Sequence, residues 1–304
     1  MDPKAAYESV LNEVKKHIAG KTDIIELMFI AVVANGHSLL EGVPGVAKTM
    51  MTKSLADAID ADFKRIQGTP DLDMQDIVGY TYIDDTDHEV KIKNGPIFTN
   101  ILLLDELNRS PARTMAGFLE ALEERQVTIP GAPTQKLREP FITFATQNPL
   151  NIEGTTPLPK VLSDRFMMRI AVNYPSREEE EEMLRIKEGE ANVRTNKTIG
   201  LQDILDMQTL ANTVTISDDV IKYITTLVDA TREDIHVVMG GSPRAEISFM
   251  KGGKAKALIE GRKEVTIEDV KFLAKPVLSH RLVVRSTGGI GVNGIIDGIV
   301  AGLK

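Results

Sequence analysis

One short stretch combines the residue types that hold a phosphate group. It runs from Glu41 to Thr49 and reads Glu-Gly-Val-Pro-Gly-Val-Ala-Lys-Thr. An apolar run, Ser38–Leu40, precedes it and a helical pattern follows, so we expect a strand, a tight glycine turn and a helix start. In that geometry the loop N–H groups point inward and the helix N-terminus adds positive charge, which together hold an anion of triphosphate size. Lys48 would reach the β- and γ-phosphates, and the Thr49 hydroxyl would bind Mg²⁺.

The loop departs from the strict pattern at Ala47, where the pattern has glycine. We expect ordinary helical backbone angles at Ala47, for which alanine carries no steric cost; only a positive φ would favour glycine. The alternative is a plain strand-to-helix turn rich in small residues, so other segments must decide. The predicted nucleotide-binding residues of this stretch are Val43, Pro44, Gly45, Val46, Ala47, Lys48, Thr49 and Met50.

Two acids follow the most apolar segment of the chain. Ile101–Leu104 reads as a strand buried on both faces, and Asp105 and Glu106 come directly after it. Asp105 stands where a phosphate loop needs its metal-binding carboxylate. Glu106 is placed to orient and deprotonate a water that attacks the γ-phosphate. The alternative is two acids that merely end a strand before a helix.

Three further polar residues complete the predicted chemistry. Asn148 follows the next apolar strand and is a candidate for holding the attacking water, although an Asn-Pro pair is also an ordinary turn. Arg165 and Arg244 are candidates for neutralising the charge that develops on the γ-phosphate. Each arginine taken alone would be interpreted as a surface residue.

Alternating strands and helices position these residues. The pattern predicts strands at 38–41, 62–66, 101–104, 141–146 and 167–172 and helices at 4–18, 22–34, 48–59 and 111–124. Such alternation implies an α/β fold with a parallel, doubly wound sheet. Two interruptions, 79–97 and 126–138, read as β-hairpins inserted into this core.

The pattern changes after residue 175, which is the predicted domain boundary between a core, 1–175, and a helical domain, 176–304. Helix starts are predicted at Ser176, where Glu179 completes a capping box, and at Ser217, Pro243 and Thr266. The acid run 178–182 and the lysines at 251, 254 and 256 are interpreted as solvated helix faces. The glycine-rich tail, 288–302, predicts no element.

Composition limits the class of protein. The 304 residues carry a formal charge of −8, which argues against nucleic acid as the main partner. The chain has no cysteine, so disulfides and thiolate chemistry are excluded. With neither a signal-peptide pattern at the start nor an apolar run long enough to span a membrane, we expect a cytoplasmic protein without membrane insertion.

The order of these motifs resembles the AAA+ ATPases and, more narrowly, the MoxR family. The narrower resemblance is carried by Gly42–Thr49, Asp105–Arg109, Leu119–Ile129 and Gly154–Pro159, with the lid matched around Ser242–Ala245. Alanine before the loop lysine is what that family carries. A departure lies at 160–163, Lys-Val-Leu-Ser, where the family usually has Pro-Glu-Ala-Gln-Leu, so the helix before Arg165 is expected to pack differently.

The resemblance implies a five-stranded P-loop core with two hairpin inserts, an all-helical lid, ATP or ADP with Mg²⁺ bound between them, and a ring that is most often a hexamer. It assigns Asn148 to sensor 1, Arg165 to an arginine finger that acts on the neighbouring subunit, and Arg244 to sensor 2. Ile18 and Ala19 fall where the family's chain passes the adenine.

The resulting hypothesis is an ATPase that remodels or activates other proteins. Proteins with a von Willebrand factor A domain are the partners that the resemblance implies. One alternative is a nucleic-acid motor or metal-chelatase subunit, against which the acids at 84, 85, 87 and 89 of the first hairpin count. A second is a nucleotide-gated scaffold without hydrolysis, which the presence of both Glu106 and Arg165 disfavours.

Overall fold

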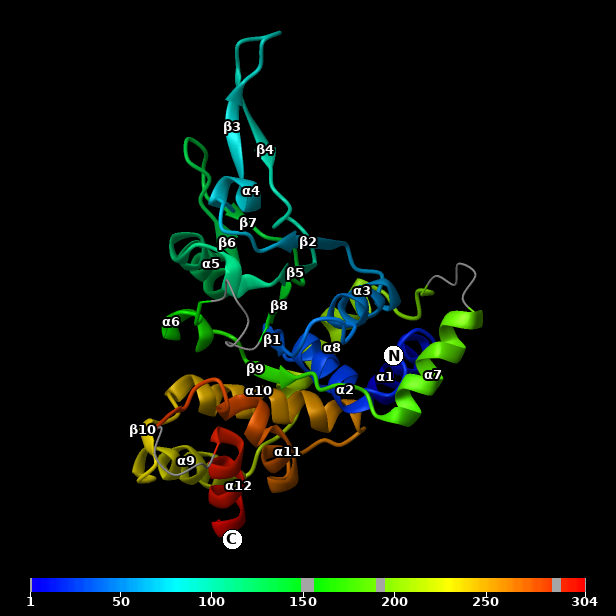
Figure 1. Ribbon diagram of the computed structural model, residues 1–304, viewed down its shortest axis with the longest axis vertical. Coiled ribbons are helices and arrows are strands. Elements are labelled where there is room, and N and C mark those ends of the chain that lie inside the picture. The colour runs from blue at the N-terminus through cyan, green and yellow to red at the C-terminus, as the bar shows by residue number, and fades with distance from the viewer. Residues whose placement is uncertain (1, 149–155, 190–194, 286–290, 304) are drawn as a thin grey trace.

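Five parallel strands form the central sheet of the computed structural model, which describes residues 2–148, 156–189, 195–285 and 291–303 (Figure 1). Their order across the sheet is β2-β5-β8-β1-β9, and every pairing is parallel. The strands are β1 Ser38–Glu41, β2 Phe63–Gln67, β5 Ile101–Asp105, β8 Ile142–Gln147 and β9 Met168–Ala171. The predicted α/β fold with a five-stranded parallel sheet is confirmed. Because the strands run the same way, the loops after β1, β5 and β8 leave the sheet at one edge.

Helices cover both faces of the sheet, as continuous apolar strands require. Ile101 and Leu103 pack in one buried cluster with α1 Pro3–Lys15, α2 Thr22–Val33 and α3 Lys48–Ala58. Leu102 and Leu104 point the other way, into a second cluster with α4 Met74–Val78 and α5 Ala112–Glu124. A short 3₁₀ turn, η1 Leu107–Arg109, joins β5 to α5. Successive side chains of β5 point to opposite faces of the sheet, so this one strand contributes to both hydrophobic clusters.

Both inserted hairpins are present where they were predicted. The first pairs β3 Gly79–Ile83 with β4 Val90–Asn94, and the second pairs β6 Gln126–Val127 with β7 Gln135–Lys136. The first projects far from the sheet, as Figure 1 shows at the top. Its side chains are largely exposed. The Thr81 hydroxyl donates to the carbonyl oxygen of Pro130 at 3.1 Å, so the two hairpins touch.

The C-terminal half is mainly helical. After α6 Lys160–Ser163 and β9 come α7 Arg177–Gly189, α8 Leu201–Thr213, α9 Asp218–Glu233, α10 Pro243–Ile259, α11 Ile267–Leu278 and α12 Val292–Gly302. The predicted caps are confirmed: Ser217 and Thr266 accept from helix N–H groups, and Ser176 and Glu179 exchange side chain–backbone hydrogen bonds. We call α7–α12 the lid.

Three features of this half differ from the sequence-based expectations. β10 Val237–Met239 and β11 Val283–Val284 form a short antiparallel sheet that was not predicted, because strands this short carry no period. The tail contains α12, whose glycines hid its helical pattern. The interpretation of Lys256 as solvated is wrong: its Nζ lies 2.8 Å from carboxylates of Glu26 and Glu260.

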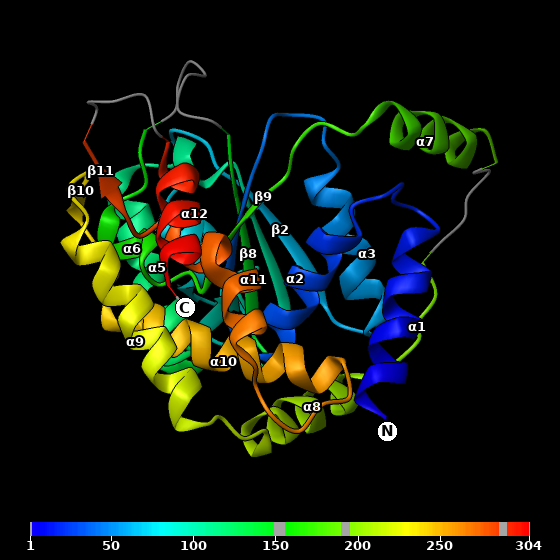
Figure 2. The same ribbon diagram turned by 90° about the horizontal axis from the view of Figure 1, so that it is seen from below.

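The lid packs on the core rather than standing apart from it. Ala245 and Phe249 of α10 and Leu273 of α11 belong to the same buried cluster as α2 and β9. Figure 2 shows α10 and α8 running beneath α2. In both views α7 instead lies on the far side of α1, away from the other lid helices. The domain boundary after residue 175 stays a prediction.

Candidate functional site

The loop between β1 and α3 passes twice through the left-handed region. Gly45 has φ 86°, and Ala47 has φ 63° and ψ 20°. The expectation of helical angles at Ala47 is therefore wrong: α3 begins at Lys48, and Ala47 is the last residue of the turn. Turns of this kind aim successive N–H groups at one point and form an anion-binding concavity. For alanine the conformation costs about 1–2 kcal/mol, which glycine would avoid.

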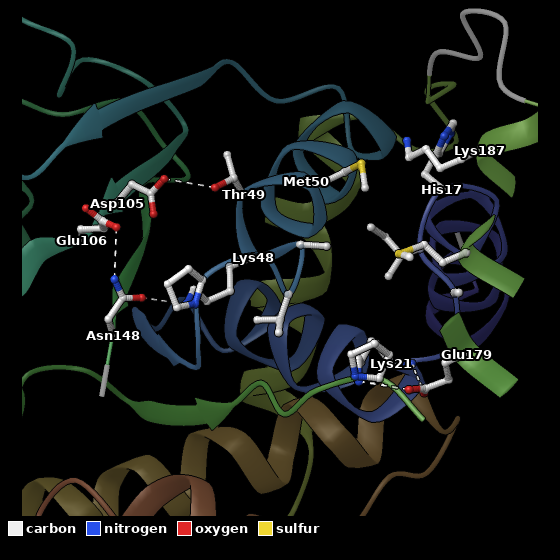
Figure 3. A pocket seen from close by; sticks show the side chains of 18 residues that line it. His17, Lys21, Lys48, Thr49, Met50, Asp105, Glu106, Asn148, Glu179 and Lys187 are labelled. Carbon is white, nitrogen blue, oxygen red and sulfur yellow. Dashed lines mark hydrogen bonds and ion pairs between the residues drawn. The ribbon is translucent and has the colours of Figure 1, made fainter. Parts of the chain in front are cut away.

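Lys48 folds back over this loop (Figure 3). Its Nζ donates to the carbonyl oxygens of Gly42 and, at 3.1 Å, of Val43, and it lies 3.4 Å from Oδ1 of Asn148. Burial lowers the pKa of Lys48, while nearby carboxylates act against that effect. Among the described residues, the acceptors that hydrogen-bond this ammonium are all neutral. A phosphate oxygen in their place would form a stronger, charge-assisted bond.

Asp105 lies beside Thr49 at the carboxyl end of β5. The Thr49 hydroxyl donates to Oδ2 of Asp105 at 3.1 Å, and the Thr146 hydroxyl donates to Oδ1 at 2.7 Å. A hydroxyl and a carboxylate side by side suit Mg²⁺, which completes its shell with phosphate oxygens and waters. Within the described ranges no three acidic, histidine or cysteine side chains gather as a metal cage. The donor set thus fits a Mg²⁺ that arrives with a nucleotide.

Glu106 adopts left-handed angles, φ 54° and ψ 44°, which are uncommon for a residue other than glycine and cluster at functional sites. Its Oε1 accepts from Nδ2 of Asn148 at 3.1 Å, and its Oε2 accepts from Nε2 of Gln67 at 3.0 Å and from Arg109 at 2.9 Å. The carboxylate is held from three sides. Asn148 therefore joins the predicted base to Lys48 through its two amide atoms.

Two residues at this site were not predicted from the sequence. Arg65 donates from Nε to Oδ2 of Asp105 at 2.9 Å, and its terminal nitrogen lies 2.7 Å from the same oxygen. Gln67, two residues on, bonds Arg65 as well as Glu106. In the register of β2 and β5, Gln67 stands opposite Asp105. Polar residues at the end of the strand next to Asp105 were the signal that could have found them.

A cavity of about 440 Å³ opens beside these groups, within the size range of small-ligand pockets. Ile18, Ala19 and the loop residues 44–50 line it, together with Asp105, Glu106 and Asn148. Val43, by contrast, packs against the hydrophobic cluster and does not line the cavity. Pro149, Gly154 and Thr155 of the sequence motifs lie outside the described residues.

The opposite wall of the cavity comes from α7, through Glu179, Met183 and Lys187 (Figure 3). Glu179 ties this helix to the core, since its Oε2 lies 3.1 Å from Nζ of Lys21. Among the described residues, none of α8–α12 lines the cavity. The expected contact between nucleotide and lid therefore reduces to α7.

Arg165 and Arg244 lie together at a different place. They line a second pocket, of about 290 Å³, that shares no described residue with the first. One carboxylate joins them: Glu123 lies 2.5 Å from a terminal nitrogen of Arg165 and 2.9 Å from one of Arg244. These two arginines hold the pKa of Glu123 below its ordinary value. The structure brings the predicted finger and sensor 2 together and keeps both away from Lys48.

Comparison with known proteins decides the family. Residues 37–168 match the family described as ATPase family associated with various cellular activities (AAA), and residues 229–290 match the AAA lid domain. Over 91% of this chain and 75% of its own length, Chaperone MoxR1 of Mycobacterium tuberculosis is 38% identical. The chain belongs to the MoxR family of AAA+ ATPases.

Other relatives of this MoxR-family chain agree. Uncharacterized protein YeaC of Bacillus subtilis is 39% identical over 97% of this chain and 93% of its own. A crystal structure of a protein from Cytophaga hutchinsonii, provisionally described as an ATPase, superposes with a TM-score of 0.91 at 38% identity, covering 99% of this chain and 95% of that one. The MoxR-family chain is thus an ATP-hydrolysing enzyme. In the parts described, no helix is long and apolar enough to cross a membrane.

Proposed function

We propose that this MoxR-family ATPase works as a ring of identical subunits, in which one subunit binds Mg·ATP and the next supplies the arginines that hydrolysis needs. The observation that carries the proposal is the separation of the two pockets. Lys48, Asp105 and Glu106 line one, while Arg165 and Arg244 line the other. An arginine that cannot reach its own subunit's nucleotide can still stabilise charge on a neighbour's. A hexamer is the ring that the family resemblance implies.

Within one site the roles follow from the contacts. Lys48 and the loop N–H groups bind the phosphates, and Ile18 and Ala19 contact the adenine. Thr49 and Asp105 would hold Mg²⁺, which would supply positive charge beside the phosphates. Glu106 takes the proton of the attacking water. Its hydrogen bond to Asn148, which also lies beside Lys48, keeps the carboxylate aligned with the phosphates.

We further propose that the ATPase acts on partner proteins through its first hairpin. The relative from Mycobacterium tuberculosis is named a chaperone. The hairpin exposes large side chains, namely Tyr80, Tyr82, Ile83, Val90 and Ile92, with exposed fractions from 39% to 64%. Exposed apolar groups of this kind suit contact with another protein. A client with a von Willebrand factor A domain is the specific partner that the resemblance implies.

A nucleic-acid partner is less compatible with the same hairpin. Lys91 is already neutralised, because its Nζ lies 2.6 Å from Asp84 and 2.7 Å from Asp87. Lys93 does lie beside an aromatic ring, 5.6 Å from the centre of Tyr80, but the same hairpin carries acids at 84, 85, 87 and 89. A surface that tracks a polyanion needs unpaired basic groups beside its aromatic ones.

The test replaces Glu106 by glutamine. Glu106→Gln should lower kcat for ATP hydrolysis about 10²- to 10⁴-fold, as expected for loss of a general base, and leave ATP affinity nearly unchanged. Glu8→Gln, at an exposed position of α1, is the control and should keep full activity. Undiminished hydrolysis by Glu106→Gln would refute the assignment of the base.

A mixing experiment tests the shared site. Arg165→Ala and Glu106→Gln subunits, each with a strongly lowered but measurable kcat alone, should regain part of the activity when they assemble together, because some interfaces then hold an intact Glu106 and an intact Arg165. Absence of rescue in rings shown to contain both subunits would contradict the action of Arg165 on a neighbour.

A further inference from the structure

The segment that carries Arg165 is held from the lid as well as from the core, where the N–H of Met167 donates to the carbonyl oxygen of His37 at 2.7 Å. It comprises α6 and residues 164–167, and on the lid side it meets His280 and Arg281, which lie two and three positions after the end of α11. Both side chains are buried, with exposed fractions of 7% for His280 and 3% for Arg281. Two buried polar side chains that converge on one short segment are a built contact rather than incidental packing.

Arg281 donates hydrogen bonds to the backbone on both sides of Arg165. Its Nε donates to Oδ1 of Asp164 at 3.0 Å, and one terminal nitrogen donates to the carbonyl oxygens of Asp164 at 3.3 Å and Phe166 at 2.9 Å. The other donates to the carbonyl oxygen of Met167 at 3.1 Å. A guanidinium has its donors fixed in one plane, so these bonds fix the carbonyl groups of three residues, Asp164, Phe166 and Met167, at once.

Burying the Arg281 guanidinium is energetically unfavourable, which indicates that its contacts with this segment are specific. Burial lowers the pKa of Arg281 to about 10, while the Asp164 carboxylate acts in the opposite direction. A buried charge is tolerated only where it is paired and fully hydrogen-bonded. Asp164 is in turn fixed by a second lid residue, since the Ser242 hydroxyl donates to its Oδ1 at 2.9 Å.

His280 holds the same segment at its other end. Its Nε2 lies 2.9 Å from the carbonyl oxygen of Phe166, and its own carbonyl oxygen accepts from Nζ of Lys160 at 3.0 Å and from the Ser163 hydroxyl at 3.2 Å. Burial lowers the pKa of His280 well below its ordinary value, so the ring is neutral and Nε2–H is the donor. Lys160 and Ser163 belong to the four residues that depart from the usual family sequence, and here both side chains donate to the lid.

We propose that Arg281 is a positioning residue for Arg165, so that the lid, together with the α/β core, sets where the finger points. The inference rests on the proposed function, in which Arg165 acts on a neighbour's nucleotide. Arg281 acts through the backbone at Asp164 and Phe166, whereas the Arg165 side chain makes its own bonds, to Glu123 and to the carbonyl oxygen of Val161. A displacement of α11 would carry the finger with it.

The experiment compares two lysine replacements in the assembled protein. Arg281→Lys keeps the charge but loses the planar fork, and it should lower kcat on the order of tenfold to a hundredfold, as a displacement of about 1 Å does to a catalytic group. The KM for ATP and the affinity for ADP should stay unchanged, because the subunit's own cavity is untouched. Arg262→Lys breaks a similar contact within the lid, to Asp269, and should lower thermal stability without lowering kcat.

A double-mutant cycle separates positioning from simple support of the fold. In an Arg165→Ala background, Arg281→Lys should cause no further loss of kcat, because the group that it positions is gone. A loss that multiplies with that of Arg165→Ala overturns the inference and leaves the finger assignment intact. Full activity of Arg165→Ala itself would overturn both.

Asp164→Asn provides a second route if Arg281→Lys does not fold. The replacement has the same shape and removes the charge that meets Arg281, the Ser242 hydroxyl and, at 3.6 Å, Arg244. It should also lower kcat with unchanged KM, and it should be silent in the Arg165→Ala background. Wild-type kcat in Asp164→Asn would count against the inference.

Discussion

Replacement of Ala47 by glycine should make the protein more stable, although the same replacement inside a helix is destabilising. Ala47 has φ 63° and ψ 20°, a conformation that costs alanine about 1–2 kcal/mol and glycine nothing. Glycine also adds freedom to the unfolded chain, which removes about 0.4–1 kcal/mol of that gain. The difference leaves a net stabilisation of about 0.8 kcal/mol. For a unit of this size that raises the unfolding midpoint by about 1–2 °C.

The assay is thermal unfolding without nucleotide, followed by circular dichroism, with Ala116→Gly as the control. Ala116 is exposed inside α5, where glycine should lower stability by about 1 kcal/mol. The two identical replacements should therefore shift the midpoint in opposite directions. Ala47→Val should lower it, since a β-branched residue is a severe outlier at this φ. A fall for Ala47→Gly that matches the control would refute the left-handed strain argument.

Two further variants test charged contacts. Arg65 lies against the Asp105 oxygen that also meets Thr49, so Arg65→Gln should raise the apparent Mg²⁺ affinity of the nucleotide complex. An exposed ion pair is worth about 0.2–1 kcal/mol, which corresponds to an increase of about 1.5- to 5-fold. A fluorescent-nucleotide titration measures this affinity, and weaker Mg²⁺ binding by the variant would contradict the prediction. Burial raises the pKa of Asp269, but Arg262 and Thr266 outweigh it, and the net shift is downward. The ionised Asp269 therefore contributes its full stabilisation above about pH 4, and this contribution is lost as the pH falls through the lowered pKa. Asp269→Asn should lower the free energy of unfolding in urea by about 2 kcal/mol at pH 7 and by progressively less below pH 4.

Much of the core was predictable because its signals are local. The run Ile101–Leu104 reads as a buried strand, and the acids that follow it must then lie at the carboxyl edge of a parallel sheet. Lys48 and Asn148 follow other strands that end at this edge. The parallel pairing of these strands therefore brings together groups that are far apart in the sequence. The structure has Lys48, Asn148 and Glu106 in one chain of hydrogen bonds for that reason.

The contacts across strands were not predictable in the same way. Nothing in the sequence around Arg65 or Gln67 distinguishes these residues from other polar groups at a strand end. Their importance comes from the strand order, which places β2 directly beside β5. Ala47 shows a related limit. Whether a residue ends a turn or begins a helix changes φ from positive to negative, and element boundaries read from patterns are uncertain by more than one residue.

The place of Arg244 depends on how the lid packs, and that is decided by residues far from any motif. Ala245 and Phe249, on the helix that Arg244 opens, are fully buried in one cluster with α2 and β9. This packing draws the start of α10 toward Asp164 and Arg165 instead of toward the nucleotide loop. The sequence motif shows that an arginine follows Gly-Ser-Pro. Which phosphate that arginine can reach is determined by how the apolar face of its helix packs. Here the face that buries Phe249 points Arg244 to the pocket shared with Arg165. In the proposed ring the two arginines would therefore serve the same neighbour.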